Sequence, residues 1–310
     1  MSTARRALVT GGAGFIGSHL VDRLVADGQS VCVIDDLSTG SERNVPRAAR
    51  LQRIDIGDAE ALRHAIAAFR PDFVFHIAAQ TDVGRSIREP DFDARVNVLG
   101  SLNVLRAAVV AGTRRIVYAS SAAVYGTPER LPVPETHPTR PLSDYGASKL
   151  AFEHYLHAYQ ARGLIEFAAL RYANVYGPRQ QVSGEAGVVA IFTRGMLAGD
   201  PVTIFGDGRK TRDYVYVGDV VEATVRAAQG PAGVVANLGW GREVSDLELF
   251  RAIAAATRYP NQPTYAADRP GDIARICLDA AAAQRTWSWK PAIALSDGVR
   301  QVVEWTARLA

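Results

Sequence analysis

A glycine-rich turn near the start of the chain constrains the fold more than any other stretch. An apolar run at residues 7–10 leads into residues 11–17, Gly-Gly-Ala-Gly-Phe-Ile-Gly, and apolar residues then recur at helical spacing. Gly12, Gly14 and Gly17 fit the pattern G-x-G-x-x-G in its required setting between a strand and a helix. Such a turn lets a dinucleotide pyrophosphate approach the backbone, where the amino end of the helix stabilises it. We therefore expect a dinucleotide-binding fold.

An acidic residue at the end of the second predicted strand narrows the choice of dinucleotide. The apolar run at residues 30–34 is followed by Asp35 and Asp36. Asp35 lies 18 residues beyond Gly17, about where a carboxylate accepts hydrogen bonds from the adenosine ribose 2′-OH. No arginine follows it to meet a 2′-phosphate. The pattern favours NAD over NADP.

Strands and helices alternate through the first half of the chain. Further strands are predicted at 53–56, 72–79, 115–119 and 167–172, and helices at 59–69, 96–111 and from Tyr145 onward. This order predicts an α/β, Rossmann-like, doubly wound parallel sheet that binds its ligand beyond the carboxyl ends of the strands. Four residues of interest fall at such ends: Gly14, Asp35, Ala78 and Ser121.

Beyond Asn174 the regular alternation breaks into shorter pieces. Helices are predicted near 188–197, 220–228, 246–257 and 296–309, and a strand at 202–205. We expect an NAD-binding domain at residues 1–172. Residues 173–310 are expected to form mainly a smaller mixed α/β lobe that covers a substrate and is interleaved with the first domain.

Tyr145 and Lys149 open the helix that follows a proline-rich loop, with Ser143 or Asp144 able to cap it. Four residues apart, they stand on one helix face. An ammonium so close stabilises a phenolate, so the pKa of Tyr145 is expected to fall from about 10 toward neutrality, where a general base is most useful. The pair could take a proton from an alcohol.

Composition excludes several classes of function. The net charge is only +3 over 310 residues, without a basic block of the kind that binds nucleic acid. Cys32 and Cys277 lack the spacing of a metal site or a disulfide framework. His76, in a buried-looking strand, is interpreted as a satisfied core residue. No apolar run reaches the ~20 residues of a membrane span, and we expect a cytoplasmic protein without metal.

Three motifs follow the glycine turn in order: residues 120–126 (Ser-Ser-Ala-Ala-Val-Tyr-Gly), the Tyr145–Lys149 pair, and residues 171–178 (Arg-Tyr-Ala-Asn-Val-Tyr-Gly-Pro). With them the chain resembles the extended short-chain dehydrogenase/reductases, and within these the NAD-dependent nucleotide-sugar epimerase/dehydratase family. The resemblance runs from about residue 7 to residue 305. The motifs are most similar to those of bacterial UDP-glucose (UDP-galactose) 4-epimerases.

The resemblance implies roles for individual residues. Tyr145 is the base, Lys149 also holds the nicotinamide ribose, and Ser121 hydrogen-bonds the reacting sugar oxygen. The residues expected to contact NAD are Gly11, Gly14, Phe15, Ile16, Gly17, Asp35, Asp36, Ser38, Thr39, Gly40, Asp55, Ile56, Ile77, Ala78, Ala79, Gln80, Asn97, Ser120, Tyr145, Lys149 and Tyr172. Those expected to contact the UDP-sugar are Ser121, Ala122, Asn174, Val188, Val189, Ile204, Phe205, Arg212, Arg269 and Asp272. Two arginines suit a diphosphate because each guanidinium makes paired, charge-assisted bonds.

The residues after Ser121 separate the activities of the family. Dehydratases carry an Asp-Glu pair there and decarboxylating relatives a Glu, whereas this chain has Ala122 and Ala123, which transfer no proton. The resemblance therefore implies 4-epimerisation of a UDP-hexose through a transient 4-keto sugar, with hydride returned to the opposite face.

Several alternatives stay open on the sequence. Ile276, at a position that limits room for a C2 N-acetyl group, neither admits nor excludes UDP-N-acetylglucosamine, and a UDP-glucuronate substrate would need donors such as Arg85, Arg179 or Arg275. UDP over dTDP rests on the resemblance. A catalytically silent NAD sensor and a simple alcohol dehydrogenase are the alternatives of another class. Relatives pair through the helices at 97–111 and 145–161, so a homodimer is expected.

Overall fold

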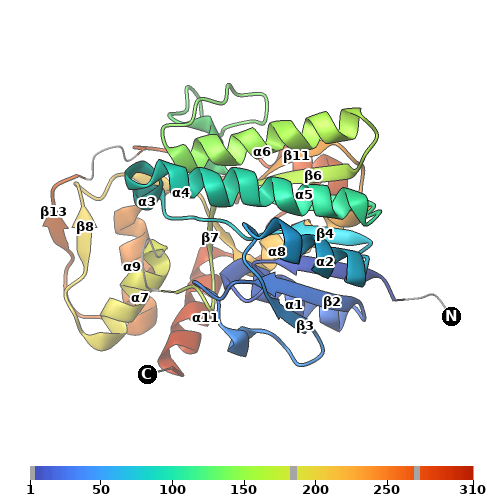
Figure 1. Ribbon diagram of the computed structural model, residues 1–310. Coiled ribbons are helices and arrows are strands. Elements are labelled where there is room, and N and C mark those ends of the chain that lie inside the picture. Colours follow the sequence, from blue (N-terminus) through green and yellow to red (C-terminus); the bar gives the residue numbers. More distant parts are fainter. Residues whose placement is uncertain (1–3, 182–186, 269–272, 310) are drawn as a thin grey trace.

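Seven parallel strands form the centre of the computed structural model, which describes residues 4–181, 187–268 and 273–309 (Figure 1). Their order across the sheet is β11-β6-β5-β4-β1-β2-β3, and every neighbouring pair is parallel. The strands are β1 (Arg6–Thr10), β2 (Ser30–Asp35), β3 (Arg50–Arg53), β4 (Phe73–His76), β5 (Arg115–Ser121), β6 (Glu166–Tyr172) and β11 (Val234–Leu238). The predicted doubly wound α/β fold is confirmed. The strand order reverses between β1 and β4, which creates a crevice at their carboxyl ends.

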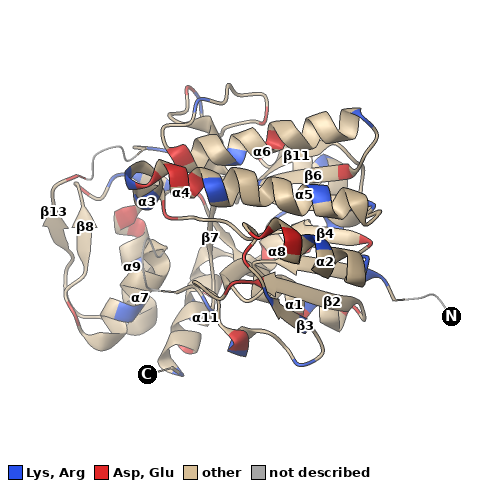
Figure 2. Ribbon diagram, in the orientation of Figure 1, with Lys and Arg blue, Asp and Glu red and all other residues tan. Residues whose placement is uncertain are grey.

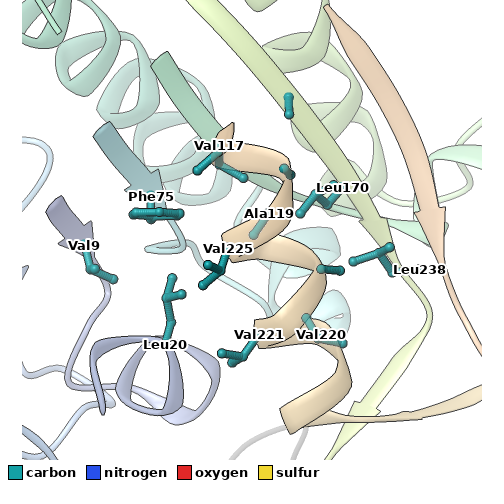
Figure 3. Packing of buried hydrophobic residues seen from close by; sticks show 14 of the residues in the cluster. Val9, Leu20, Phe75, Val117, Ala119, Leu170, Val220, Val221, Val225 and Leu238 are labelled. Atoms are coloured by element: carbon teal, nitrogen blue, oxygen red, sulfur yellow. The ribbon is translucent and has the colours of Figure 1, made fainter. Parts of the chain in front are cut away.

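Helices cover both faces of the sheet. On one face, α1 (Phe15–Ala26) and α8 (Val217–Gln229) bury their apolar stripes against the strands. Figure 3 shows this packing, in which the labelled residues are Val9, Leu20, Phe75, Val117, Ala119, Leu170, Val220, Val221, Val225 and Leu238. The other face is covered by α2 (Ala59–Phe69), α5 (Ser101–Val110) and α6 (Asp144–Ala161). Because both faces are buried, the central strands are continuous apolar runs.

Two predicted strands end earlier than expected. β3 stops at Arg53 rather than at 56, because Asp55 accepts a bond from the Gly57 N–H at 2.7 Å and turns the chain toward α2. β4 stops at His76 rather than at 79, because the N–H groups of Ile77 and Ala78 both donate to the Thr10 carbonyl. Each deviation carries the chain across the carboxyl edge of the sheet, where the crevice lies.

The helix predicted at 96–111 begins as the π-helical segment η2 (Arg95–Gly100) and continues as α5. Two short helices precede it, α3 (Val83–Arg88) and α4 (Pro90–Ala94), and the single-turn segments η1 (Glu42–Asn44) and η3 (Ala122–Tyr125) lie in loops at the crevice edge of the sheet. A π-helical turn inside an α-helix often marks a functional site. Here it contains Asn97, one of the residues expected near NAD.

The smaller lobe mixes helices with three separate strand pairs, as expected. Its helices are α7 (Val188–Ala198), α9 (Asp246–Thr257) and α11 (Leu295–Ala307), whereas α10 (Ala281–Trp287) packs against β11 and α8 of the main sheet. Its strands pair as β7 (Asn174–Tyr176) with β10 (Tyr214–Tyr216), β8 (Thr203–Phe205) with β13 (Thr264–Ala266), and β9 (Thr211–Arg212) with β12 (Val244–Ser245). Between these pieces the chain returns to the main sheet as α8 and β11, a strand that the sequence pattern does not predict. The domain boundary at residue 172 stays a prediction.

Two observations concern the surface. In the view of Figure 2, acidic and basic residues are scattered over a mainly uncharged ribbon. Among the described residues, no helix has both the length and the apolar character that crossing a bilayer requires.

His76 lies fully buried on β4 and is satisfied on both ring nitrogens, as predicted for a core histidine. Its Nδ1 lies 2.7 Å from Thr10 Oγ1, and its Nε2 lies 2.8 Å from Ser101 Oγ. Since Ser101 Oγ donates to the Asn97 carbonyl, the consistent tautomer carries its proton on Nε2. Desolvation, with a smaller effect of the Lys149 charge, lowers the pKa of His76 to about 3.

We therefore expect His76 to make stability depend on pH. Above its ordinary pKa of 6.5 the neutral ring contributes fully, and this stability is lost as the pH falls toward the folded-state pKa of about 3. Between pH 7 and pH 5 the loss from this one group is about 2 kcal/mol. Urea unfolding at several pH values should show a shallower pH dependence for His76→Asn than for the wild type or for His64→Gln, which changes an exposed histidine. Equal slopes in all three proteins would contradict the assignment.

Candidate active site

The glycine turn after β1 lies so close to the backbone after β4 that a side chain at Gly11 would not fit between them. Gly11 has a φ of +68°, and a Cβ on it would lie 2.7 Å from the Ala78 nitrogen. A Cβ on Gly17 would lie 2.0 Å from the Gly11 carbonyl oxygen. These two glycines are required by the backbone itself, because it must turn sharply and pass from β1 into α1 within a few residues.

Gly14 has a different role, since a Cβ there would meet only the Gly11 oxygen, at 3.3 Å. It is the N-cap of α1, and no side chain caps the N–H groups of that first turn. A side chain on Gly14 would therefore occupy the approach to the helix amino end rather than clash with the fold. Free N–H groups, the helix dipole and an open approach together fit the pyrophosphate of a dinucleotide.

Asp35 organises the loop beside this turn. Its Oδ2 accepts from the Ala13 N–H and its Oδ1 from the Leu37 N–H, both at 2.9 Å. Burial raises the pKa of this carboxyl, and the two backbone bonds oppose the rise. Each oxygen accepts one protein bond and has room for a second, so Asp35 fits an adenosine ribose while it holds the glycine turn in place.

The predicted residues after Asp35 form a loop at the carboxyl end of β2. Asp36 Oδ1 accepts from both the N–H and the hydroxyl of Ser38, and the Thr39 carbonyl accepts from the Gln181 side chain. Gly40 packs so closely that a Cβ would lie 2.9 Å from Asp35 Oδ1. On the next strand, Asp55 is exposed and Ile56 is buried beneath Gly100.

Asn97 ties the end of β4 to the catalytic helix. Its Oδ1 accepts from the Gln80 N–H at 2.8 Å, and its Nδ2 is within 3.2 Å of the Gln80 carbonyl, Asp93 Oδ1 and Ser148 Oγ. Ile77, Ala78 and Ala79 precede this contact at the carboxyl edge, half-buried and open toward the crevice. The network orders that edge, where we predict that a dinucleotide binds.

The structure brings Ser121, Tyr145 and Lys149 together at the end of β5. Ser143 caps α6 by accepting from the Gly146 N–H at 3.2 Å, so Tyr145 lies in the first turn. Lys149 Nζ lies 5.8 Å from the centre of the Tyr145 ring and donates to the Ala119 carbonyl at 2.8 Å. The Ser121 side chain lies close enough to the Tyr145 hydroxyl to act on its pKa as a hydrogen-bond partner. Hydroxyl, phenol and ammonium thus share one end of the crevice.

The expected fall in the pKa of Tyr145 is wrong for the site as the protein's own atoms form it. Although the ring is only half-buried, desolvation raises the pKa of Tyr145 to about 12. The hydrogen bond with Ser121 opposes this rise, and the Asp93 carboxylate adds to it. The four-residue spacing indicates the nearby charge of Lys149, whereas the loss of water around the phenol is set by the folded structure.

Lys149 is itself strongly affected by burial, with 3 % of its surface exposed. Desolvation lowers its pKa to about 7, and the carboxylates of Asp93 and Glu153 act in the opposite direction. The ammonium also lies 4.9 Å from the centre of the Tyr118 ring. A lysine in this condition responds to any change in the charges around it.

Tyr172 and Ser120, the remaining predicted cofactor contacts, lie on the strands beside this site. Tyr172 pairs with Ser121 in the register of β5 and β6, and its hydroxyl is 3.2 Å from Thr224 Oγ1 on α8. Burial raises the pKa of Tyr172 to about 12. The Ser120 side chain points to Glu153, to which its hydroxyl donates at 2.5 Å.

The predicted substrate residues line the smaller lobe. Asn174 begins β7 with an exposed side chain, opposite Tyr214 in the register with β10. Arg212 is half-buried, and its Nη1 donates to the carbonyls of Thr211 and Ile273. Val189 and Ile204 are core residues of the lobe, and Val188 and Phe205 are half-buried in it. Ala122 is buried directly after Ser121. Arg269 and Asp272 lie outside the described residues.

Asp213, which directly follows Arg212, orients backbone. Its carboxylate accepts from the N–H groups of Trp240, Gly241 and Leu278 at 2.8 to 3.1 Å. Burial raises its pKa to about 6, against the effect of those three bonds. By these contacts the residue that follows Arg212 is attached to the loop after β11 and to the chain at Leu278.

Two buried carboxylates near Lys149 were not predicted from the sequence. Asp93 lies four residues before Asn97, and Glu153 four residues after Lys149, so both share a helical face with a predicted site residue. That spacing was the available signal. It is weak, because charged residues at such spacing are far more often solvated.

Comparison with known proteins agrees with this geometry. Residues 7–239 match the NAD dependent epimerase/dehydratase family. The chain is 48% identical to a UDP-glucose 4-epimerase of Mycolicibacterium smegmatis, over 96% of this chain and 97% of that protein. Among solved structures it superposes, with a TM-score of 0.96 and 42% identity, on the UDP-glucose 4-epimerase of Thermotoga maritima with UDP-glucose, over 98% and 99% of the two chains.

A second solved structure, the UDP-glucose 4-epimerase of Thermus thermophilus in complex with NAD, gives a TM-score of 0.94 and 43% identity and covers 98% of this chain and all of that one. The family match spans most of the chain, and the similarity to the relatives is nearly full length. From the glycine turn at β1, the Ser121–Tyr145–Lys149 group and these similarities together, the chain belongs to the NAD-dependent epimerase/dehydratase family.

Proposed function

We propose that this protein is an NAD-dependent 4-epimerase that interconverts UDP-glucose and UDP-galactose. The observation that carries the proposal is the grouping of Ser121, Tyr145 and Lys149 at the switch-point crevice, followed by two alanines in place of a second acid/base pair. The relatives from Mycolicibacterium smegmatis and Thermotoga maritima are named for this activity.

In this proposal Tyr145 removes the proton from the C4 hydroxyl of the sugar, and Ser121 holds the same oxygen by a hydrogen bond. When bound, NAD supplies the hydride acceptor and returns the hydride, so that no cosubstrate is consumed. Because the pKa of Tyr145 is about 12, the base needs positive charge nearby, and the protein's own source of it is Lys149.

The residues after Ser121 favour epimerisation over elimination of water. Ala122 is buried with 9% exposure and packs with Val124, and Ala123 carries no titratable group either. A 4-keto sugar formed beside them meets no second acid or base from this turn, so proton return by Tyr145 is the step that remains open. Return of hydride to the other face of the sugar then inverts C4.

For the UDP part, we propose that Asn174, Arg212 and Arg269 bind the diphosphate and that Val188, Val189, Ile204, Phe205 and Asp272 surround the nucleoside. What supports this is the position of Asn174 and Arg212 on two neighbouring short strand pairs of the smaller lobe. A tether at the diphosphate leaves the sugar free to present either face.

The ion pairs of three arginines support a neutral sugar over glucuronate as the hexose of the substrate. A glucuronate carboxylate needs a free donor, whereas Arg85, Arg179 and Arg275 are already paired with Glu89, Asp22 and Glu243 at 3.0, 2.7 and 2.6 Å. Ile276, which the resemblance places near the sugar C2 group, is buried and packs with Ala122. We therefore propose a neutral hexose, with UDP-N-acetylglucosamine as the alternative substrate.

Proton NMR of the purified protein with UDP-glucose, without added NAD, tests the function. We expect UDP-galactose to appear, since the cofactor is regenerated in each turnover and stays bound. Parallel reactions with UDP-N-acetylglucosamine and UDP-glucuronate rank the three substrates. No conversion of any of them, with NAD then added in excess, would contradict the proposal and favour an NAD-binding sensor, whereas net NADH release would indicate a dehydrogenase.

Tyr145→Phe tests the assignment of the base. Removing one oxygen from a preformed site should lower turnover of UDP-glucose by at least about 10³-fold, while NAD content and UDP binding stay near normal. Turnover is measured by NMR, and binding by calorimetry with UDP. A variant that keeps more than a tenth of wild-type activity would show that another group takes the proton.

We also propose that the protein forms a homodimer through α5 and α6, which lie side by side in Figure 1. The charged residues of α5 and α6 are sparse in Figure 2, and three large side chains are exposed on or next to them: Leu99 at 56%, Val110 at 74% and Tyr155 at 41%. Burial of such a surface by a second copy is favourable, because it removes apolar side chains from water.

Val110→Glu should therefore shift the mass measured by light scattering from dimer to monomer. Ile191→Glu, which adds the same charge to an exposed apolar position on α7, should leave it unchanged. A monomeric wild type would refute this proposal.

A further inference from the structure

A buried ion pair directly behind the reacting groups has no part in the function proposed above. Glu153 on α6 and Arg171 on β6 are 2% and 7% exposed. Arg171 Nη2 donates to Glu153 Oε2 at 2.6 Å, and Arg171 Nε donates to Glu153 Oε1 at 3.0 Å. This is the paired geometry in which a guanidinium binds a carboxylate most strongly.

The pair also holds the chain on both sides of Ser121. On the amino side, the Ser120 hydroxyl donates to Glu153 Oε1 at 2.5 Å. On the carboxyl side, Arg171 Nη1 donates to the hydroxyl of Tyr125 at 2.9 Å, at the end of the short turn that follows Ser121. Ser121 therefore lies between two residues that are both fixed to one ion pair.

Glu153, the carboxylate of the pair, lies on the same helix as Tyr145, about two turns further along α6. Tyr145, Lys149 and Glu153 follow one another at four-residue intervals on one helix face. Lys149 is bonded to the Ala119 carbonyl and Glu153 to Ser120, so two successive turns of α6 are attached to two successive residues of β5. Any change at Glu153 acts on the distance between Ser121 and Tyr145.

We infer that Glu153, held in place by Arg171, is a positioning residue that aligns Ser121 with Tyr145 and whose negative charge stabilises the Lys149 ammonium. The inference rests on the proposed epimerase function. It explains why a carboxylate and a guanidinium are buried where neither can reach the crevice, since burial of such a pair contributes little to stability compared with apolar residues of similar volume.

Several groups determine the charge state of Lys149. Asp93 faces it from α4, His76 from β4, Tyr118 from β5, and Tyr145 and Glu153 from its own helix. His76 is neutral throughout the working range, because its pKa is about 3. The negative charges acting on the ammonium are therefore those of Asp93 and Glu153, which raise its pKa against desolvation.

Glu153→Gln removes one of these charges and keeps the shape of the side chain. The pKa of Lys149 should then fall, and Arg171, left without its counter-charge, should lower it further. We expect the basic limb of the kcat/KM profile for UDP-glucose to move to lower pH by about 1 unit. Turnover at pH 7 should fall about tenfold with KM changed less than about twofold, because Lys149 acts on the base and not on substrate binding.

The same two strands supply a matched control. At their amino ends Arg115 and Glu166 form a second ion pair between β5 and β6, at 2.7 Å, far from the crevice edge. Glu166→Gln should alter the unfolding midpoint without moving the pH profile or the turnover of UDP-glucose. A merely structural role for Glu153 would make the two variants behave alike.

Ser120→Ala tests the alignment of Ser121 with Tyr145 without changing the charge near Lys149. It also provides a second test if Glu153→Gln does not fold. It removes the bond from the strand to Glu153, so turnover should fall at unchanged NAD content while the basic limb stays at its wild-type pH. Wild-type turnover and pH profile in Glu153→Gln would overturn the inference, as would unchanged turnover in a folded Ser120→Ala. Absence of conversion by the wild type would instead refute the proposed epimerase activity, so the two failures are distinguishable.

Discussion

The approach of β4 to the turn after β1 is the contact on which the rest of the site depends. Only glycine fits at residue 11, where a Cβ would lie 2.7 Å from the backbone of Ala78 and where φ is positive. Because of this approach, the point where the strand order reverses lies beside the amino end of α1. The crevice, the first turn of α1 and the carboxylate of Asp35 therefore meet at the carboxyl edge of the sheet. The binding place for a dinucleotide is thus a consequence of backbone packing.

The second constraint is the burial of a cation beneath the crevice. Lys149 is 3 % exposed, and an isolated buried ammonium is unfavourable unless other groups compensate for its lost hydration. The protein provides a backbone carbonyl, an aromatic ring and two carboxylates, and Arg171 in turn balances Glu153. The polar groups of α4, α6, β5 and β6 therefore form one electrostatic unit. The proton transfer that we propose at Tyr145 depends on that unit as well as on the residue itself.

Much of the fold could be predicted from the sequence, because the patterns that indicate it involve residues close together in the chain. The glycine turn, the acid at the end of β2, the apolar strands and the capped helix at Tyr145 each depend on residues close together in the chain. The predictions failed where contacts between distant residues decide. The Thr10 carbonyl ends β4, and β11 joins β6 after an excursion through the smaller lobe. No periodicity within 234–238 indicates such a partner. The early end of β3 is the exception, because there the turn is local, from the Gly57 N–H to Asp55.

By itself, the sequence determined the parallel α/β architecture and the NAD-type turn, since side-chain chemistry and short-range spacing carry those. The proposed reacting triad rests on the four-residue spacing of Tyr145 and Lys149 and, for Ser121, on the resemblance to the family. Only the tertiary structure decided the protonation of that triad. The four-residue spacing indicated that Lys149 acts on Tyr145, but folding removes water from both groups and moves the pKa of Tyr145 to about 12 and that of Lys149 to about 7. Desolvation depends on every atom that packs around a group, so it becomes defined only when the strands and helices meet.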